Sequence, residues 1–306
     1  MRALTQTAER AWPAAMLCGE NRQLSPQQDH AFCRVIGRLA VRSLYAELTL
    51  YPKPGLVSLV DNGSHDDMTA ATFMRSLFSL RHYFIRITEA GRDDAPFATL
   101  KRLGIEAEQR MLAATCGINT HRGAIFCIGM LCAAIGYCHA QRITLSVAAI
   151  RAALLMQWGD ALAAHMQSGA PGSHGLLAAA QHAASGAREE MARGLPSVFE
   201  VALPALLQTL AAGRDWDHAR IDALFSLMAH ISDTNVYHRG GKLGATTVRH
   251  HAQRFLALGG TAHSGWQDHA LHSHRIFTER RLSPGGAADL LAAACLVHEV
   301  TGPFCK

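Results

Sequence analysis

The chain has 306 residues and a formal net charge of +5, and 49% of its residues are hydrophobic while 17% are charged. This composition excludes an intrinsically disordered chain, and the lack of any Lys/Arg run argues against a nucleic-acid-binding protein. No window is expected to span a membrane. The eight cysteines form no C-x-x-C pair, which favours a reducing, cytoplasmic location.

The predicted elements are all helices. Residues 1–30 show little periodicity and are expected to form a loosely ordered N-terminal segment. From residue 31 onward, Ala- and Leu-rich stretches recur at helical spacing without any alternation of strands and helices. The short linkers favour one large multi-helix bundle over residues 31–306, an all-α fold. Helices are expected at residues 31–50, 69–91, 98–114, 122–139, 145–167, 174–185, 197–212, 217–231, 242–258, 267–280 and 286–299.

A polar stretch from Glu47 to Met68 follows the first predicted helix. Two prolines break the helix there, with Lys53 between them and Gly55 directly after. The loop that follows carries His65 and Asp67, so anion binders, proton carriers and metal ligands lie close together in sequence. An ordinary surface turn has a similar composition, and Asp67 could simply cap the next helix.

A second polar cluster precedes the helix expected at residues 122–139. Either Asn119 or Thr120 can cap that helix, whose free N–H groups would also attract a phosphate. Arg122 adds a fork-shaped donor at the same place. Capping does not explain His121, Arg122 and Gly123 together, so we interpret this cluster as a binding site.

A third cluster, Gly186 to Pro196, carries two arginines and two glutamates, Arg188, Glu189, Glu190 and Arg193. Pairs at i, i+3 and i, i+4 on a solvated helix face account for most of this pattern. We favour that structural interpretation for the cluster as a whole.

The fourth cluster, Asp233 to Gly241, is expected to be an irregular turn before the next helix. Asp233 and Asn235 are of the types that bind a metal or a ribose, and Arg239 precedes the glycine pair Gly240 and Gly241. Such a pair lets backbone amides approach an anion while the guanidinium neutralises it. A plain turn would need the glycines but neither the arginine nor the aspartate.

The fifth cluster begins with Ser283, which is expected to cap the last helix. Gly285 and Gly286 are costly in a first helical turn unless a ligand approaches the backbone there. Asp289 lies one turn further into the helix and faces the same way.

Read in order, the five clusters resemble the triphosphoribosyl-dephospho-CoA synthase family over about residues 40–295. The motifs are Y-P-K-P-G-L-V with N-G-S-H-D-D-M, G-I-N-T-H-R-G-A-I-F, G-A-R-E-E with G-L-P, D-T-N-V-Y-H-R-G-G, and S-P-G-G-A-A-D-L-L. Their details are closer to the malonate decarboxylase branch than to the citrate lyase branch. Members join ATP to 3′-dephospho-CoA, so the resemblance implies an all-helical pentosyltransferase.

The resemblance also implies the reaction. The 2′-hydroxyl of dephospho-CoA attacks C1 of the ATP ribose, adenine leaves, and Mg²⁺ accompanies the triphosphate. The α configuration of the family product points to one inverting displacement. A phosphoribosyl-dephospho-CoA transferase would then place the group on an acyl carrier protein. No nucleic-acid or membrane partner is expected, and a homodimer remains open.

The resemblance and the residue types together suggest roles. Lys53, Arg122, Arg239 and Arg188 would bind phosphates, and Glu47 or His65 would be the base. Asp67, Asp233 and Asp289 would hold Mg²⁺ or face the developing oxocarbenium ion, and His121 would protonate or hydrogen-bond the departing adenine. Further substrate contacts are expected from Gly55, Asn119, Thr120, Gly123, Asn235, Gly240, Gly241, Ser283, Gly285 and Gly286.

Two alternatives remain at this point. A helical Mg²⁺-dependent hydrolase of the N-glycosidic bond in nucleotides or ADP-ribose would also place aspartates on loops between helices. A non-catalytic CoA- or nucleotide-binding adaptor would need the basic residues but not the carboxylates.

Overall fold

The computed structural model describes residues 26–167 and 186–302, and these contain helices but no β-strand. The all-α fold expected from the sequence is confirmed. The expected helix at 174–185, and residues 1–25 of the expected N-terminal segment, lie outside the described residues. The helices are α1 (Pro26–Thr49), α2 (Ala70–Arg92), α3 (Phe97–Ala114), α4 (Arg122–Ala140), α5 (Val147–Gln167), α7 (Ala187–Ala192), η2 (Ser197–Ala202), α8 (Leu203–Ala211), α9 (Trp216–His230), α10 (Thr234–Ala257), η3 (Gly260–Ala262), α11 (Trp266–Glu279) and α12 (Gly285–Thr301).

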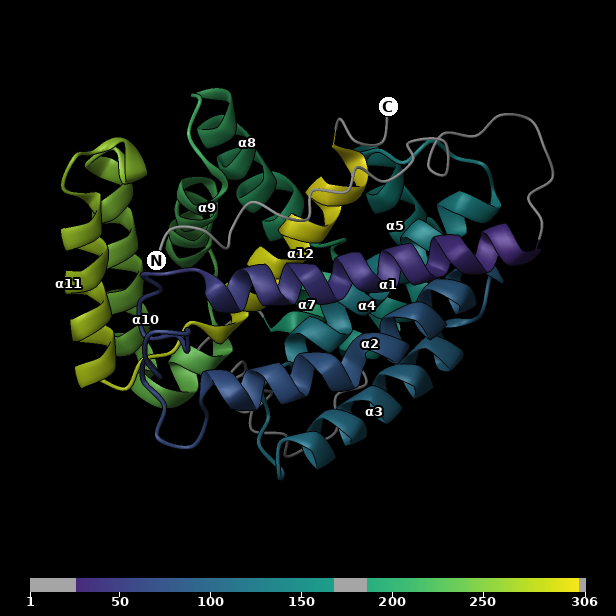
Figure 1. Ribbon diagram of the computed structural model, residues 1–306, viewed down its shortest axis with the longest axis horizontal. Coiled ribbons are helices and arrows are strands. Elements are labelled where there is room, and N and C mark those ends of the chain that lie inside the picture. The colour runs from purple at the N-terminus through teal and green to yellow at the C-terminus, as the bar shows by residue number, and fades with distance from the viewer. Residues whose placement is uncertain (1–25, 168–185, 303–306) are drawn as a thin grey trace, which may run out of the picture.

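Helix α4 lies in the interior of the bundle, as its sequence requires. It is apolar on all sides, and such a helix is stable only when other helices surround it. Helices α2, α5 and α12 pack against it, and α1 packs on α2 and α12 (Figure 1). A methyl group at Gly136 would overlap the carbonyl oxygen of Thr88, so a glycine is needed at this contact between α2 and α4.

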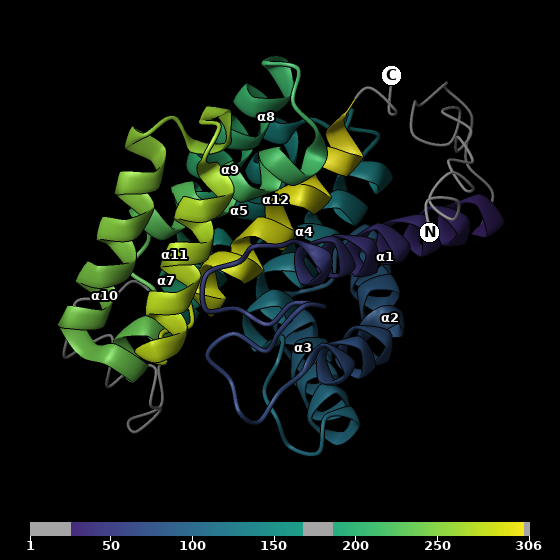
Figure 2. The ribbon, with the colours of Figure 1, turned by 60° about the vertical axis from the view of Figure 1, so that its left-hand side comes forward.

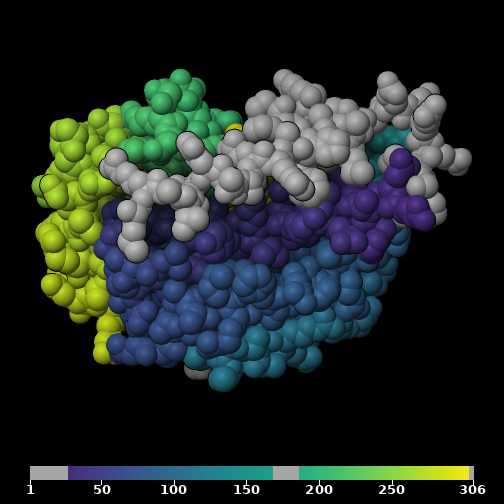
Figure 3. Space-filling model, in the orientation of Figure 1, coloured from purple at the N-terminus to yellow at the C-terminus, as the bar shows by residue number. Residues whose placement is uncertain are grey.

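Helices α1, α2 and α3 form successive bands on the face seen in Figure 3. Helices α10 and α11 lie side by side at one end of the molecule, and the loop between α1 and α2 lies next to α11 (Figure 2). Ser64 ties this loop down, because its Oγ lies 3.1 Å from the carbonyl oxygen of Phe277 and 2.6 Å from that of Leu282. The loop is therefore held close to the start of α12.

Two helices of the described chain, α4 and α5, are long and apolar enough to cross a membrane by length and composition. This corrects the expectation that no window would reach that length. The apolar window is 72% buried within the protein in α4 and 28% buried in α5. The core helix of a bundle passes the same test, and α4 is such a helix.

Three helices differ in extent from the prediction. Helix α1 begins at Pro26 instead of 31, and the predicted helix 197–212 is divided into η2 and α8. Helix α10 begins at Thr234 instead of 242, so most of the expected turn is helical. The predicted start at 242 is still visible, because α10 consists of two helical segments that meet at Gly241, whose backbone is not helical (φ 58°, ψ −155°).

Candidate active site

A cavity of about 920 Å³ lies where the loop between α1 and α2 meets the N-terminal ends of α4, α10 and α12 and helix α7. All five polar clusters contribute to its wall. The predicted site residues in the wall are Glu47, His65, Asn119, Thr120, His121, Arg122, Gly123, Arg188, Asp233, Asn235, Arg239, Ser283, Gly285, Gly286 and Asp289. Among the predicted site residues, those outside the wall are Lys53, Gly55, Asp67, Gly240 and Gly241.

Glu47 and Lys53 form a buried ion pair at one side of the cavity. Their side chains are 6% and 1% exposed, and Lys53 Nζ donates to Glu47 Oε1 at 2.6 Å. Burial lowers the pKa of Lys53, and the adjacent carboxylate of Glu47 opposes that shift. Only Glu47 of the pair reaches the cavity wall, so the ammonium of Lys53 serves as its counter-ion.

Asp233 joins the first turns of two helices. Its Oδ1 accepts a hydrogen bond from the backbone N–H of Asn235 in α10 at 2.8 Å, and its Oδ2 accepts one from that of Ala287 in α12 at 3.2 Å. Burial raises the pKa of the Asp233 carboxyl, while these backbone donors lower it. This carboxylate therefore holds the two helix ends together and lines the cavity at the same time.

Asp289 lies one turn into α12 and faces the N-terminal end of α4. A methyl group at Gly123 would overlap Asp289 Oδ2, so the carboxylate packs directly on the backbone there. Burial, followed by the negative charges of Glu47 and Asp233, raises the pKa of Asp289 well above its ordinary value of 3.8. Three carboxylates thus lie near one another, and of these Glu47 is paired with the buried ammonium of Lys53.

His65 is held between two elements. Its Nδ1 accepts a hydrogen bond from Arg239 Nη2 at 3.1 Å, and its Nε2 lies 2.8 Å from Ser283 Oγ. Burial, followed by the positive charge of Arg239, lowers the pKa of His65. Asp67 Oδ1 lies 3.7 Å from His65 Nδ1, and the side chain of Asp67 is 61% exposed.

The expected helix caps are replaced by other residues. Ser283 contacts His65, while Pro284 occupies the cap position of α12. At α2 the cap is Thr69, which leaves Asp67 outside the helix. At α4 the cap position is occupied by His121 and not by Asn119 or Thr120, but Asn119 Oδ1 still accepts a hydrogen bond from the backbone N–H of Arg122 at 3.2 Å.

His121 is buried in the wall, 2% exposed. Its Nδ1 lies 2.6 Å from Ser76 Oγ on α2, and its Nε2 is buried with no hydrogen-bond partner. Burial, with a smaller contribution from Lys53, lowers the pKa of His121 to about 3. Arg122, next in sequence, is 57% exposed and bonds Glu108 through Nε at 2.6 Å.

The sequence profile of the family described as ATP:dephospho-CoA triphosphoribosyl transferase matches residues 33–305. This chain belongs to that family. A protein of Pectobacterium atrosepticum named "2-(5''-triphosphoribosyl)-3'-dephosphocoenzyme-A synthase" is 39% identical over 275 residues, 86% of this chain and 88% of the relative. Two further relatives carry the same name with the prefix "Probable". The protein of Acinetobacter calcoaceticus is 38% identical, over 92% of this chain and 98% of the relative. The protein of Vibrio cholerae is 36% identical, over 89% of this chain and 90% of the relative. No solved structure was found to match the chain.

The third cluster of this transferase is not the solvated face that the sequence indicated. Glu190 lines the cavity, and its two carboxylate oxygens accept hydrogen bonds from Ser197 N at 2.6 Å and Ser197 Oγ at 3.1 Å. Burial raises the pKa of Glu190, which these bonds lower. Arg188 also lines the cavity, with a buried Nη1 that has no hydrogen-bond partner. Glu189 and Arg193 are the solvent-facing members of the cluster.

The transferase also has apolar cavity walls that sequence reasoning did not assign. Phe73 on α2 contacts the ring of His121, and Phe97 and Phe126 contact the ring of His165. These residues have ordinary helical spacing, so their sequence signal cannot be told from that of core residues. Ser76 was missed for a related reason, because a serine in the middle of a helix carries no motif.

Proposed function

We propose that this transferase makes 2′-(5″-triphosphoribosyl)-3′-dephospho-CoA from ATP and 3′-dephospho-CoA, with release of adenine. The observation that carries the proposal is the convergence of Glu47, Asp233 and Asp289 in one cavity whose wall also holds arginines. Cleavage of a ribosyl C–N bond develops positive charge at C1, which carboxylates stabilise. Membership in the family supports the choice of both substrates.

The bond changes assign a proton acceptor. The 2′-oxygen of dephospho-CoA forms a bond to C1 of the ATP ribose, the C1–N9 bond breaks, and adenine leaves with its electron pair. The hydroxyl loses one proton and the departing adenine gains one, so the transfer is balanced. We assign the hydroxyl proton to Asp289, because a carboxylate with a raised pKa accepts a proton more readily at neutral pH.

The other two candidate bases suit different roles. Glu47 is held as the partner of the Lys53 ammonium, and both ring nitrogens of His65 have neighbours at hydrogen-bond distance. Glu47 would therefore stabilise charge at C1, and His65 would orient Arg239. A single displacement with inversion at C1 needs no covalent intermediate.

The triphosphate requires cationic groups. Arg239, Arg188 and Arg122 line the cavity and would bind phosphate oxygens, whereas Lys53 lies behind Glu47. In the described parts of the chain, no three His, Cys, Asp or Glu side chains are grouped to hold a metal by themselves.

Mg²⁺ bound to a nucleotide needs only one or two protein carboxylates, since phosphate oxygens and water complete its shell. The excess of carboxylates over ammonium groups around Asp289 fits such a cation. Asp233, which lines the cavity, would hold Mg²⁺ together with the triphosphate. Bound there, Mg²⁺ would neutralise phosphate charge.

We further propose that the product serves the acyl carrier subunit of malonate decarboxylase in the cytoplasm. The motif details that resemble the malonate decarboxylase branch support this assignment. A phosphoribosyl-dephospho-CoA transferase would consume the product.

The test is to incubate the purified enzyme with ATP, Mg²⁺ and 3′-dephospho-CoA and to follow free adenine and the triphosphoribosylated product by mass spectrometry. CoA serves as a parallel acceptor and is expected to react poorly, because its 3′-phosphate crowds the 2′-hydroxyl. Asp268→Asn, an exposed site in the first turn of α11, is the matched control for Asp289→Asn. Adenine release without an acceptor would favour a hydrolase, and binding without adenine release would favour an adaptor.

A further inference from the structure

Three side chains, two from the cavity wall and one from α2 behind it, form a hydrogen-bonded chain. Thr120 Oγ1 donates to Ser76 Oγ at 2.7 Å, and Ser76 Oγ lies 2.6 Å from Nδ1 of His121. Ser76 is fully buried on α2 and His121 is 2% exposed. The proton of the Ser76 hydroxyl is free to point at His121, because the Ser76 oxygen already accepts the proton of Thr120.

Donation from Ser76 to Nδ1 would select one tautomer of the imidazole. A neutral imidazole carries one N–H and one acceptor nitrogen, and an Nδ1 that accepts from Ser76 leaves the proton on Nε2. Burial keeps the ring of His121 neutral, since the pKa lies at about 3. Nε2 is the buried atom without a partner, and His121 lines the cavity. A ligand in the cavity is therefore the available acceptor for this N–H.

The surroundings favour an uncharged, flat acceptor over a phosphate. The ring of Phe73 meets that of His121 edge to face at 5.0 Å, and the sulfur of Met111 lies 3.3 Å from the backbone nitrogen of His121. A neutral donor beside apolar side chains suits a ring nitrogen, whereas a phosphate is better matched by the cavity arginines such as Arg239.

We propose that Ser76 and Thr120 are positioning residues that hold His121 as the Nε2–H tautomer, and that this N–H donates to a ring nitrogen of the purine of ATP. The proposal rests on the proposed function, since it concerns the base that leaves. Negative charge grows on the purine as the C1–N9 bond breaks, so the hydrogen bond strengthens in the transition state. Its loss lowers kcat more than it weakens ATP binding.

The first experiment compares Ser76→Ala and Thr120→Val with the wild-type enzyme. We expect kcat to fall about 10- to 100-fold for Ser76→Ala, somewhat less than for complete removal of a preorganised donor, with a smaller change in KM for ATP. Ser79→Ala is the matched control, because the Ser79 hydroxyl donates to the Ser76 carbonyl oxygen at 2.6 Å and Ser79 lies outside the cavity wall. It should leave kcat unchanged, and thermal unfolding of each variant checks that the fold is kept.

The second experiment identifies the acceptor atom with 7-deaza-ATP and 3-deaza-ATP, which each lack one ring nitrogen. In the wild-type enzyme, one analogue should lower kcat more than the other does. This difference between the analogues should be smaller in Ser76→Ala and in His121→Ala. Equal penalties in all three proteins for both analogues would overturn the purine assignment.

The tautomer of His121 can be measured by NMR in the enzyme without any catalytic turnover. In the ¹⁵N spectrum, the signal that is absent from His121→Gln should show a protonated Nε2 and an unprotonated Nδ1 in the wild-type protein. A proton on Nδ1 would overturn the positioning role of Ser76. If ATP binds with this tautomer but no triphosphoribosyl group is transferred, the proposed function fails while the tautomer assignment stands.

Discussion

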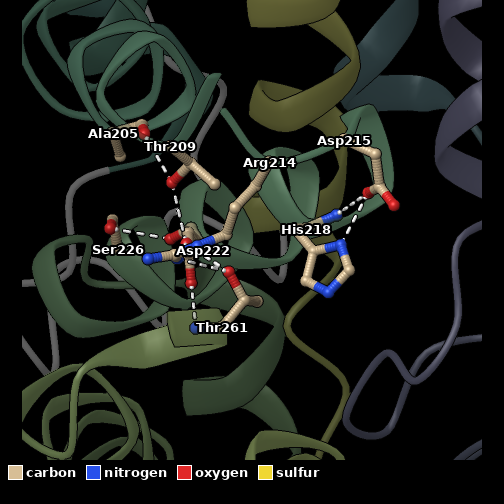
Figure 4. Close-up of polar contacts among 8 residues, drawn as sticks. All are labelled: Ala205, Thr209, Arg214, Asp215, His218, Asp222, Ser226 and Thr261. Carbon is tan, nitrogen blue, oxygen red and sulfur yellow. Dashed lines mark hydrogen bonds and ion pairs between the residues drawn. The ribbon is translucent and has the colours of Figure 1, made fainter. Parts of the chain in front are cut away.

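Asp222 on α9 and Asp289 on α12 are both carboxylates withdrawn from solvent, but only Asp222 is surrounded by donors. Asp222 is 8% exposed and accepts from Thr209 Oγ1 at 2.8 Å and from Thr261 N and Oγ1 at 2.8 and 2.7 Å (Figure 4). Arg214 lies 3.6 Å away from the same carboxylate. These bonds join the end of α8, helix α9 and η3.

Asp289, by contrast, has other carboxylates as its charged neighbours. The charged neighbours that raise its pKa are the carboxylates of Glu47 and Asp233, and the backbone N–H of Ala124 lowers it. A compensated carboxylate adds to stability, whereas a poorly compensated one costs stability and gains proton affinity. The difference separates a structural carboxylate from one suited to chemistry, and it can be tested.

The largest expected effect is on catalysis. Asp289→Asn should lower kcat by about 10³-fold, because the amide cannot accept the hydroxyl proton. The same change should raise the free energy of unfolding by about 1 kcal/mol, since it removes a charge that its neighbours repel. Product formation and urea unfolding measure the two effects, and a destabilised Asp289→Asn would contradict the comparison.

The next effect is on folding. Asp222→Ala should lower the free energy of unfolding by about 3 kcal/mol, because the donors of Thr209 and Thr261 lose a buried charged acceptor. Activity per folded molecule should stay unchanged, since Asp222 is not part of the cavity wall. Asp217→Ala, which removes a side chain that is 75% exposed, is the control and should change stability by less than about 0.5 kcal/mol.

A pH dependence follows from the raised pKa of Asp289. Because the base must be ionised, kcat should fall about tenfold per pH unit below that pKa. Stability has the opposite sign: between the ordinary value of 3.8 and the raised pKa, the folded state binds the extra proton, so falling pH favours folding at this site. The unfolding free energy of Asp289→Asn should therefore exceed that of the wild type most at neutral pH. If this difference in unfolding free energy widens on acidification, the raised pKa of Asp289 is refuted.

The smallest effect concerns the edge of the Asp222 cluster. Arg214→Ala should cost about 1 kcal/mol, because it removes the 3.1 Å bond from Nη1 to Thr261 Oγ1 and a nearby positive charge. Chemical denaturation and a parallel activity assay suffice as measurements. If Arg214→Ala lowers catalysis without lowering stability, the Asp222 cluster and the cavity around Asp289 are coupled.

By itself, the sequence determined the all-helical fold and the segments that carry chemistry. Helical periodicity is a local property, so the core helix α4 and the polar breaks could be recognised from neighbouring residues alone. The family resemblance rested on motif order, which also needs no coordinates.

The tertiary structure decided which residues of those segments meet. His65 contacts Ser283 across 218 positions, and Asp233 accepts from Ala287 across 54, so neither neighbour could be read from local spacing. The same folding left Asp67 exposed beside the site and moved Lys53 behind Glu47. Burial and charge at a given atom depend on helices packed from the whole chain, and for this reason the raised pKa of Asp289 and the unpartnered Nε2 atom of His121 emerged only from the fold.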